Sequence, residues 1–94
     1  DAPAGFHGTH VAGIVGSNDA SRPGVAPEVD LVALRVFDDM GRGRLDWTEN
    51  ALRWVLQNHN AFDSPITTVN LSLGSTWNAD SVPLWGTLED ELQQ

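Results

Sequence analysis

The chain has 94 residues, with 13 acidic residues against five basic ones and no cysteine, and its formal net charge is −8. An acidic chain repels phosphate backbones, so we expect no nucleic acid partner, and the lack of cysteine excludes disulfides, thiol catalysis and cysteine-based zinc sites within this sequence. No apolar run approaches the roughly 20 residues that a membrane-crossing helix needs, so we expect no membrane span.

The first predicted elements are a helix over residues 7–17 and a strand over residues 31–37. Val11, Ile14 and Val15 follow the i, i+3, i+4 spacing of one helix face. Each glycine of this segment weakens a helix by up to about 1 kcal/mol relative to alanine, which indicates that the helix approaches another part of the chain closely. The run LVALRVF at 31–37 is almost continuously apolar, which predicts a strand buried on both faces.

Three further elements follow in the chain. Asp46 is predicted to be the N-cap of a helix that runs to residue 58, because Glu49 stands three residues later as in a capping box. We expect a buried face on this helix, made of Ala51, Leu52, Val55 and Leu56. Residues 66–73 predict a second strand, and residues 87–94 predict a last helix with acidic residues in its first turn.

The order helix, strand, helix, strand, helix contains a strand–helix–strand unit. A crossover helix between two strands implies that the strands are parallel. The fold class is therefore α/β, with a parallel sheet covered by helices on both faces. Two strands are too few for such a sheet, so we expect only part of the domain in this chain.

The segment HGTHVAG at residues 7–13 is the main candidate for chemistry. A histidine in the first turn of a helix has a ring edge free toward a cleft, and the glycine after it leaves room for a substrate to come close. Histidine titrates near neutral pH, so it can take up and return a proton during turnover. Zinc peptidases of the HExxH type need a glutamate where Gly8 stands, so we expect no metal at these histidines.

HGTHVAG resembles the histidine signature of the subtilases, and three later segments support the resemblance. These are the GVAP turn at 24–27, the Gly-x-Gly loop at 41–43 and the NLSLG segment at 70–74. The resemblance implies a subtilisin-like fold, with residues 1–94 forming part of a peptidase S8 catalytic domain.

The resemblance also assigns roles to individual residues. His7 would be the general base of a Ser-His-Asp triad, with His10 as a buried neighbour that takes no part in catalysis. A peptide or protein substrate would pair as a β-strand between two edges. One edge would contain Gly41, Gly43 and the pocket residue Leu45, and the opposite edge would contain Ser72, Leu73 and Gly74.

The other triad members have no counterpart here. No G-T-S-x-A turn of the kind that carries the serine follows His7, and by resemblance the aspartate would lie some 30 residues before it. We therefore expect the whole protein to be a serine endopeptidase and this chain alone to be inactive. Two alternatives stay open, a catalytically inactive subtilase-like domain that binds peptides and a non-enzymatic α/β interaction domain.

The resemblance implies no cofactor for the chemistry and a secreted or extracellular location. A structural calcium ion is possible in the whole protein, but the segment 17–23 offers too few oxygen ligands to predict one here. Arg42 and Arg44 beside the expected cleft have two interpretations. They could favour acidic side chains in the substrate, or they could offset nearby aspartates, and the sequence favours the second interpretation.

Overall fold

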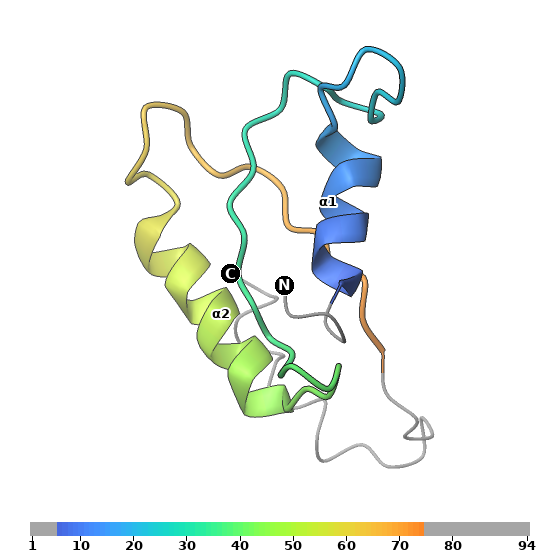
Figure 1. The fold of residues 1–94 in the computed structure, drawn as a ribbon. Helices are drawn as coiled ribbons and strands as arrows, with labels where there is room; N and C mark the ends of the chain where they lie inside the picture. Colours follow the sequence, from blue (N-terminus) through green and yellow to red (C-terminus); the bar gives the residue numbers. More distant parts are fainter. Residues whose placement is uncertain (1–5, 75–94) are drawn as a thin grey trace. The chain divides into compact units, whose positions relative to one another are not determined.

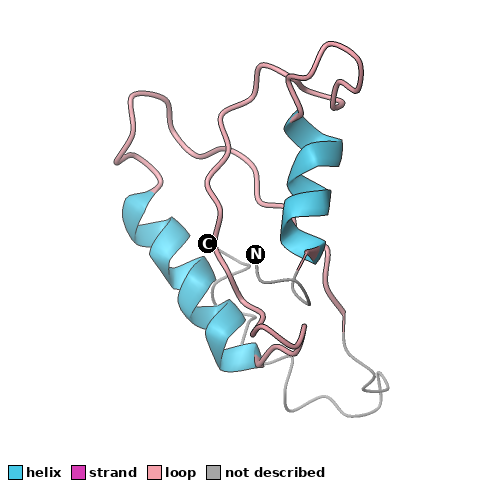
Figure 2. Ribbon diagram, in the orientation of Figure 1, coloured by secondary structure: helices cyan, strands magenta, loops and turns pink. Residues whose placement is uncertain are grey.

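The computed structural model describes residues 6–74 of the chain, and these contain two helices (Figures 1 and 2). Helix α1 spans His7–Gly16 and helix α2 spans Leu45–Asn58. The chain divides into two compact units, Asp1–Arg42 with α1 and Gly43–Gln94 with α2, and each is described by itself. Helix α1 was predicted within one residue at each end, and α2 ends where predicted but begins two residues earlier than its predicted cap implied. The predicted helix over 87–94 lies outside the described residues.

Main-chain hydrogen bonds from the GVAP turn hold the C-terminal end of α1. Val25 N–H donates to the carbonyl of Ile14 at 3.0 Å, and Ala26 N–H donates to that of Val15 at 2.8 Å. Gly24 N–H donates to the carbonyl of Ser17, just after the helix, at 2.8 Å. The last carbonyls of a helix have no partner inside it, so the turn satisfies groups that would otherwise need water.

Two glycines in this unit lie close to other parts of the chain, Gly24 against backbone atoms and Gly16 against side chains. A Cβ atom on Gly24 would stand 2.6 Å from the backbone nitrogen of Ser17 and 2.7 Å from that of Gly16. A Cβ atom on Gly16 would stand 3.0 Å from the side chain of Val29. The predicted close approach to α1 is thus confirmed at Gly16, whereas a Cβ on Gly13 would meet nothing within 4 Å.

Helix α2 buries part of the apolar face that its sequence predicts. Leu52 is 7% exposed and Thr48 is 4% exposed, and the remaining face residues Ala51, Val55 and Leu56 are half-buried. The hydroxyl of Thr48 lies 3.5 Å from the carbonyl oxygen of Arg44, one helical turn earlier, so the buried hydroxyl has a partner.

The predicted cap of α2 is wrong. Helix α2 begins at Leu45, the N-cap residue is Arg44, and no side chain caps the helix. Asp46 stands inside the first turn, where its carboxylate accepts hydrogen bonds from Nε and Nη2 of Arg44 at 2.8 and 3.2 Å. This pairing with a guanidinium takes the carboxylate that a capping box would have used, while its charge still faces the positive end of the helix dipole.

Residues 6–74 form no strand, so the parallel sheet is not confirmed and stays a prediction. The segments 31–36 and 66–73 run as loops, and Phe37 is an isolated bridge residue and not part of a strand (Figure 2). The predicted burial of 31–37 on both faces is wrong for this chain, because Leu31 is 51% exposed and Leu34 is 37% exposed. A strand exists only through hydrogen bonds to a neighbouring strand, and the residues described here supply no such ladder.

Candidate functional site

His7 is the first residue of α1, as the sequence predicts for the candidate base. Its imidazole is exposed, and the preceding Phe6 carbonyl accepts the first helical hydrogen bond from the N–H of His10 at 3.0 Å. A ring at the first turn of a helix has no preceding turn to cover it. This position therefore leaves the imidazole open to a substrate and to partner residues that would complete a triad.

Phe37 packs against His7, a contact that the sequence did not reveal. The two ring centroids lie 5.9 Å apart and the ring planes are at 90°, which is an edge-to-face arrangement. Such aromatic pairs prefer this geometry over face-to-face stacking, and each ring limits the rotation of the other. The two residues are 30 positions apart, so no local pattern could have identified the pair.

His10 does not occupy the environment that the resemblance implies. It lies one turn after His7 on α1 and is exposed, whereas a buried neighbour was expected. The reason is that α1 buries none of its ten residues in the part of the chain that the structure describes. The resemblance gives His10 no catalytic role, and its exposure alone does not assign one.

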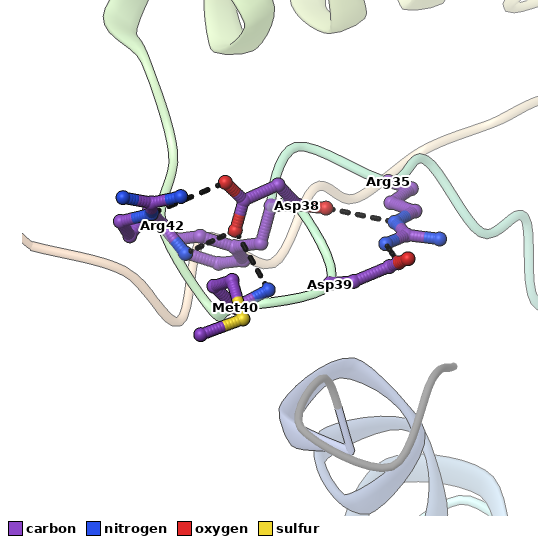
Figure 3. A network of polar contacts seen from close by, with 6 residues as sticks. Arg35, Asp38, Asp39, Met40 and Arg42 are labelled. Carbon is purple, nitrogen blue, oxygen red and sulfur yellow. Dashed lines mark hydrogen bonds and ion pairs between the residues drawn. The ribbon is translucent and has the colours of Figure 1, made fainter.

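The loop that follows Phe37 closes on the side chain of Asp38 (Figure 3). One carboxylate oxygen of Asp38 accepts hydrogen bonds from the N–H groups of Met40 and Arg42, both at 2.9 Å. The N–H of Asp38 donates to the carbonyl of Arg42 at 2.7 Å, and Gly41 N–H donates to the carbonyl of Asp38 at 3.0 Å. These bonds, chiefly the one from the N–H of Arg42, hold the pKa of Asp38 below its ordinary value.

Gly41 is required by the geometry of this loop. Its φ is 78°, in the left-handed region that glycine adopts without steric cost. Asp38 followed by a glycine three positions later is typical of a turn in which the aspartate side chain bonds to the backbone ahead of it. That pattern could have identified Asp38 as the residue that fixes the loop from the sequence alone.

The loop constrains how a peptide could pair with it. Both main-chain groups of Arg42 already bond to Asp38, so they are not available to a substrate strand. The N–H of Gly41 is also used, because it donates to the carbonyl of Asp38, so pairing by main-chain hydrogen bonds would rely on the carbonyl of Gly41 and on Gly43. Gly43 is exposed, and Leu45, the expected pocket residue, is half-buried at the first position of α2.

The second expected edge lies at the end of the described chain. Ser72 is exposed and its hydroxyl accepts a hydrogen bond from the side-chain amide of Asn70 at 2.9 Å. Leu73 is half-buried, and a Cβ on Gly74 would meet nothing within 4 Å. The open space at Gly74 is compatible with a peptide passing close to the backbone there.

The structure does not bring the predicted site residues together. His7 and Gly41 belong to the first unit, and the other site residues belong to the second, namely Gly43, Leu45, Ser72, Leu73 and Gly74. Each unit is described by itself, so a cleft formed by both edges stays a prediction.

Acidic and histidine side chains do not form a metal centre in the described range 6–74. No group of three or more such residues there is close enough to hold an ion. In the loop 17–23, Oδ1 of Asp19 accepts hydrogen bonds at 2.8 Å from both the N–H and the hydroxyl of Ser21. These bonds, led by the one from the N–H, keep the pKa of Asp19 below its ordinary value.

Comparison with known proteins gives one family and several relatives. The family model described as "Subtilase family" matches residues 2–94. Subtilisin E of Bacillus subtilis (strain 168) is 37% identical over 70 residues, which is 72% of this chain and 17% of that protein. No solved structure matches significantly.

Two further relatives differ in the location that their names state. The minor extracellular protease Epr of Bacillus subtilis (strain 168) is 38% identical over 72 residues, covering 74% of this chain and 10% of that protein. An intracellular serine protease of Paenibacillus polymyxa is 34% identical over 70 residues, covering 72% of this chain and 20% of that protein. The chain thus spans a fifth or less of the length of these relatives.

Proposed function

The chain belongs to the subtilase family, and from this premise we propose that the whole protein is a serine endopeptidase in which His7 acts as the general base. The observation that carries the proposal is the position of His7. It opens α1 within the sequence HGTHVAG, and its ring is exposed rather than buried in the unit around it. The names of the relatives, which are subtilisins and serine proteases, support the same reaction.

In the proposed reaction, a serine hydroxyl outside this chain attacks the scissile carbonyl carbon while His7 accepts the hydroxyl proton. His7 then returns the proton to the leaving amine, and water releases the acyl group by the same route. The contact with Phe37 would restrict the rotation of the imidazole. The chain itself supplies the base and parts of the substrate edges, so we expect residues 1–94 alone to be inactive.

The substrates would be peptides or proteins held in an extended conformation. Pairing would use main-chain groups of Gly41 and Gly43 on one side and of residues 72–74 on the other. We propose secretion as the location, with Epr as the supporting relative, although the relative from Paenibacillus polymyxa bears an intracellular name. No helix among residues 6–74 has the length and apolarity to cross a bilayer.

The test is hydrolysis of a fluorogenic peptide by the whole protein and by two histidine variants. His7→Ala should lower kcat by a factor on the order of 10⁴ to 10⁶, the range associated with loss of the base in such triads. His59→Ala is the control, because His59 is exposed and its Nδ1 atom contacts only the carbonyl of Leu56, at 2.9 Å, and its Nε2 the amide of Asn60, at 3.0 Å. Peptide binding without cleavage by the unmodified protein would instead establish the catalytically inactive alternative.

A further inference from the structure

Two of the arginines between residues 35 and 44 are firmly engaged by carboxylates. Arg44 donates from both Nε and Nη2 to Asp46, at 2.8 and 3.2 Å, which is the two-point pairing that a guanidinium favours. Arg35 donates from Nε to the carbonyl of Phe37 at 2.7 Å and from Nη2 to the carboxylate of Asp39. The second interpretation from the sequence, that arginines here offset aspartates, is therefore a sufficient account of Arg44.

Arg42 is held much less firmly. Within residues 6–74 its guanidinium contacts one carboxylate, through Nε to Oδ2 of Asp38 at 3.3 Å. The other oxygen of Asp38 is already shared by two backbone N–H groups, one from Met40 and one from Arg42 itself. The Arg42 side chain is 78% exposed, against 54% for Arg35 and 67% for Arg44.

The backbone beneath this exposed cation is fixed. Asp38 bonds to both the N–H and the carbonyl of Arg42, and Gly41 adopts the left-handed conformation that closes the turn. In Figure 3 the guanidinium of Arg42 and the Arg35–Asp39 pair lie at opposite ends of the network. The two Nη atoms of Arg42 thus extend from a turn that is closed mainly by bonds between Asp38 and the backbone.

We propose that Arg42 selects peptide substrates that carry a glutamate or aspartate opposite it, an inference that rests on the proposed endopeptidase function. A peptide that pairs with the main chain at Gly41 and Gly43 would place one of its side chains across from Arg42. Directly opposed residues of paired strands have Cβ atoms about 5 Å apart, within reach of a guanidinium and a carboxylate. The planar guanidinium can then donate from both Nη atoms to one carboxylate.

The overall charge makes the inference specific to one subsite. The chain carries a net charge of −8, which disfavours acidic peptides as a class. A preference for glutamate at a single substrate position would therefore reflect a group beside that position, such as Arg42, and not the net charge of this chain. At substrate positions away from Arg42 we expect glutamate to be neutral or unfavourable.

The experiment uses the whole protein and pairs of peptides that differ by one glutamate or glutamine, placed in turn at each of the four positions before the scissile bond. At one position, glutamate should raise kcat/KM by up to about fivefold over glutamine, the upper range for an opposite-charge pair across two strands. Arg42→Gln should bring that ratio to one, Arg42→Glu should reverse it, and Arg42→Lys should retain part of it.

Arg44→Gln is the matched control, because it removes the same charge two residues away and should leave the ratio unchanged. Thermal unfolding of each variant checks that it is folded. If Arg42→Glu does not fold, the comparison of Arg42→Lys with Arg42→Gln still tests the inference. A ratio of one at all four positions, or a preference that survives Arg42→Gln, would overturn the inference while cleavage of the glutamine peptide upholds the proposed function. Failure to cleave either peptide would overturn both.

Discussion

Helices α1 and α2 are stabilised by different means. Helix α1 buries none of its residues, and its C-terminal carbonyls accept main-chain hydrogen bonds from Val25 and Ala26. Helix α2 buries Leu52 and Thr48, and the side chains of Glu49 and Arg53 form an ion pair at 2.7 Å on its surface. The first helix is therefore stabilised by main-chain hydrogen bonds from a neighbouring turn, and the second by burial of part of its apolar face.

Because of this difference, the two helices and their surroundings should tolerate different kinds of substitution. Where a backbone segment lies against another, as at Gly24, a residue with a side chain does not fit, so this position is specified as glycine. Where an apolar face is buried, hydrophobic residues of similar volume can replace one another. The turn that holds α1 thus requires a glycine at position 24, whereas α2 requires only a pattern of apolar residues.

The largest effect on the free energy of unfolding is expected from Gly24→Ala, which tests the close backbone contact beside α1. The added methyl group would stand 2.6–2.8 Å from three backbone atoms of residues 15–17, and backbone atoms cannot rotate away as a side chain could. We expect the free energy of unfolding to fall by about 3 kcal/mol, at the upper end of the range for overpacked sites. Urea unfolding of the whole protein, wild type against variant, measures the change.

Gly13→Ala is the control for this substitution. Gly13 lies in the same helix, but a Cβ there would meet nothing within 4 Å, so alanine gains helix propensity at no steric cost. We expect the unfolding free energy to rise by about 0.5–1 kcal/mol. If both substitutions destabilise the protein equally, close backbone approach is not what distinguishes α1.

The second prediction tests the apolar face of α2. Leu52→Ala should lower the unfolding free energy by about 2 kcal/mol, the low end for a leucine truncation, because its neighbours on the helix are only half-buried. Leu52→Met preserves volume and should cost less than about 1.5 kcal/mol. The same urea titrations compare the two, and a methionine variant as unstable as the alanine variant would show that α2, too, needs one particular residue.

The sequence predicted both helices because helical periodicity and the residues that end a helix are local properties. The strands are a different case, since a strand depends on partners that the segments 31–37 and 66–73 do not have among residues 6–74. The cap of α2 was missed because Asp46 fitted a capping box equally well. What decided between the two arrangements was Arg44, which takes the carboxylate.

In the candidate site, too, local features could be predicted from the sequence and contacts between distant residues could not. His7 and its place at the start of a helix were identified from seven consecutive residues. Its ring contact with Phe37 depends on how residues 17–36 return the chain to the start of α1, which no local pattern encodes. The two substrate edges stay predictions for a related reason, because their residues belong to two units that are each described alone.

The smallest expected effects on stability come from two aspartates, one bonded mainly by backbone groups and the other by a side chain. The Asp38 carboxylate is bonded mainly by backbone N–H groups, and the Asp46 carboxylate by the guanidinium of Arg44. Each arrangement holds the aspartate pKa below the ordinary value of 3.8. A carboxyl whose pKa is lowered by folding stabilises the fold above its unfolded-state pKa, and this stabilisation is lost as the pH falls through the folded-state value.

Asp38→Asn and Asp46→Asn should therefore each lower Tm slightly near neutral pH, and the differences from wild type should shrink below about pH 3.8. Salt separates the two, since about 0.5 M NaCl screens exposed ion pairs but acts weakly on hydrogen bonds within a turn. We expect salt to remove the effect of Asp46→Asn and to leave most of the effect of Asp38→Asn. Equal salt sensitivity would mean that Asp38 stabilises the protein through its ion pair with Arg42 and not through its hydrogen bonds to the backbone. The loop at 38–42, like the first turn of α2, would then be stabilised by contacts between side chains.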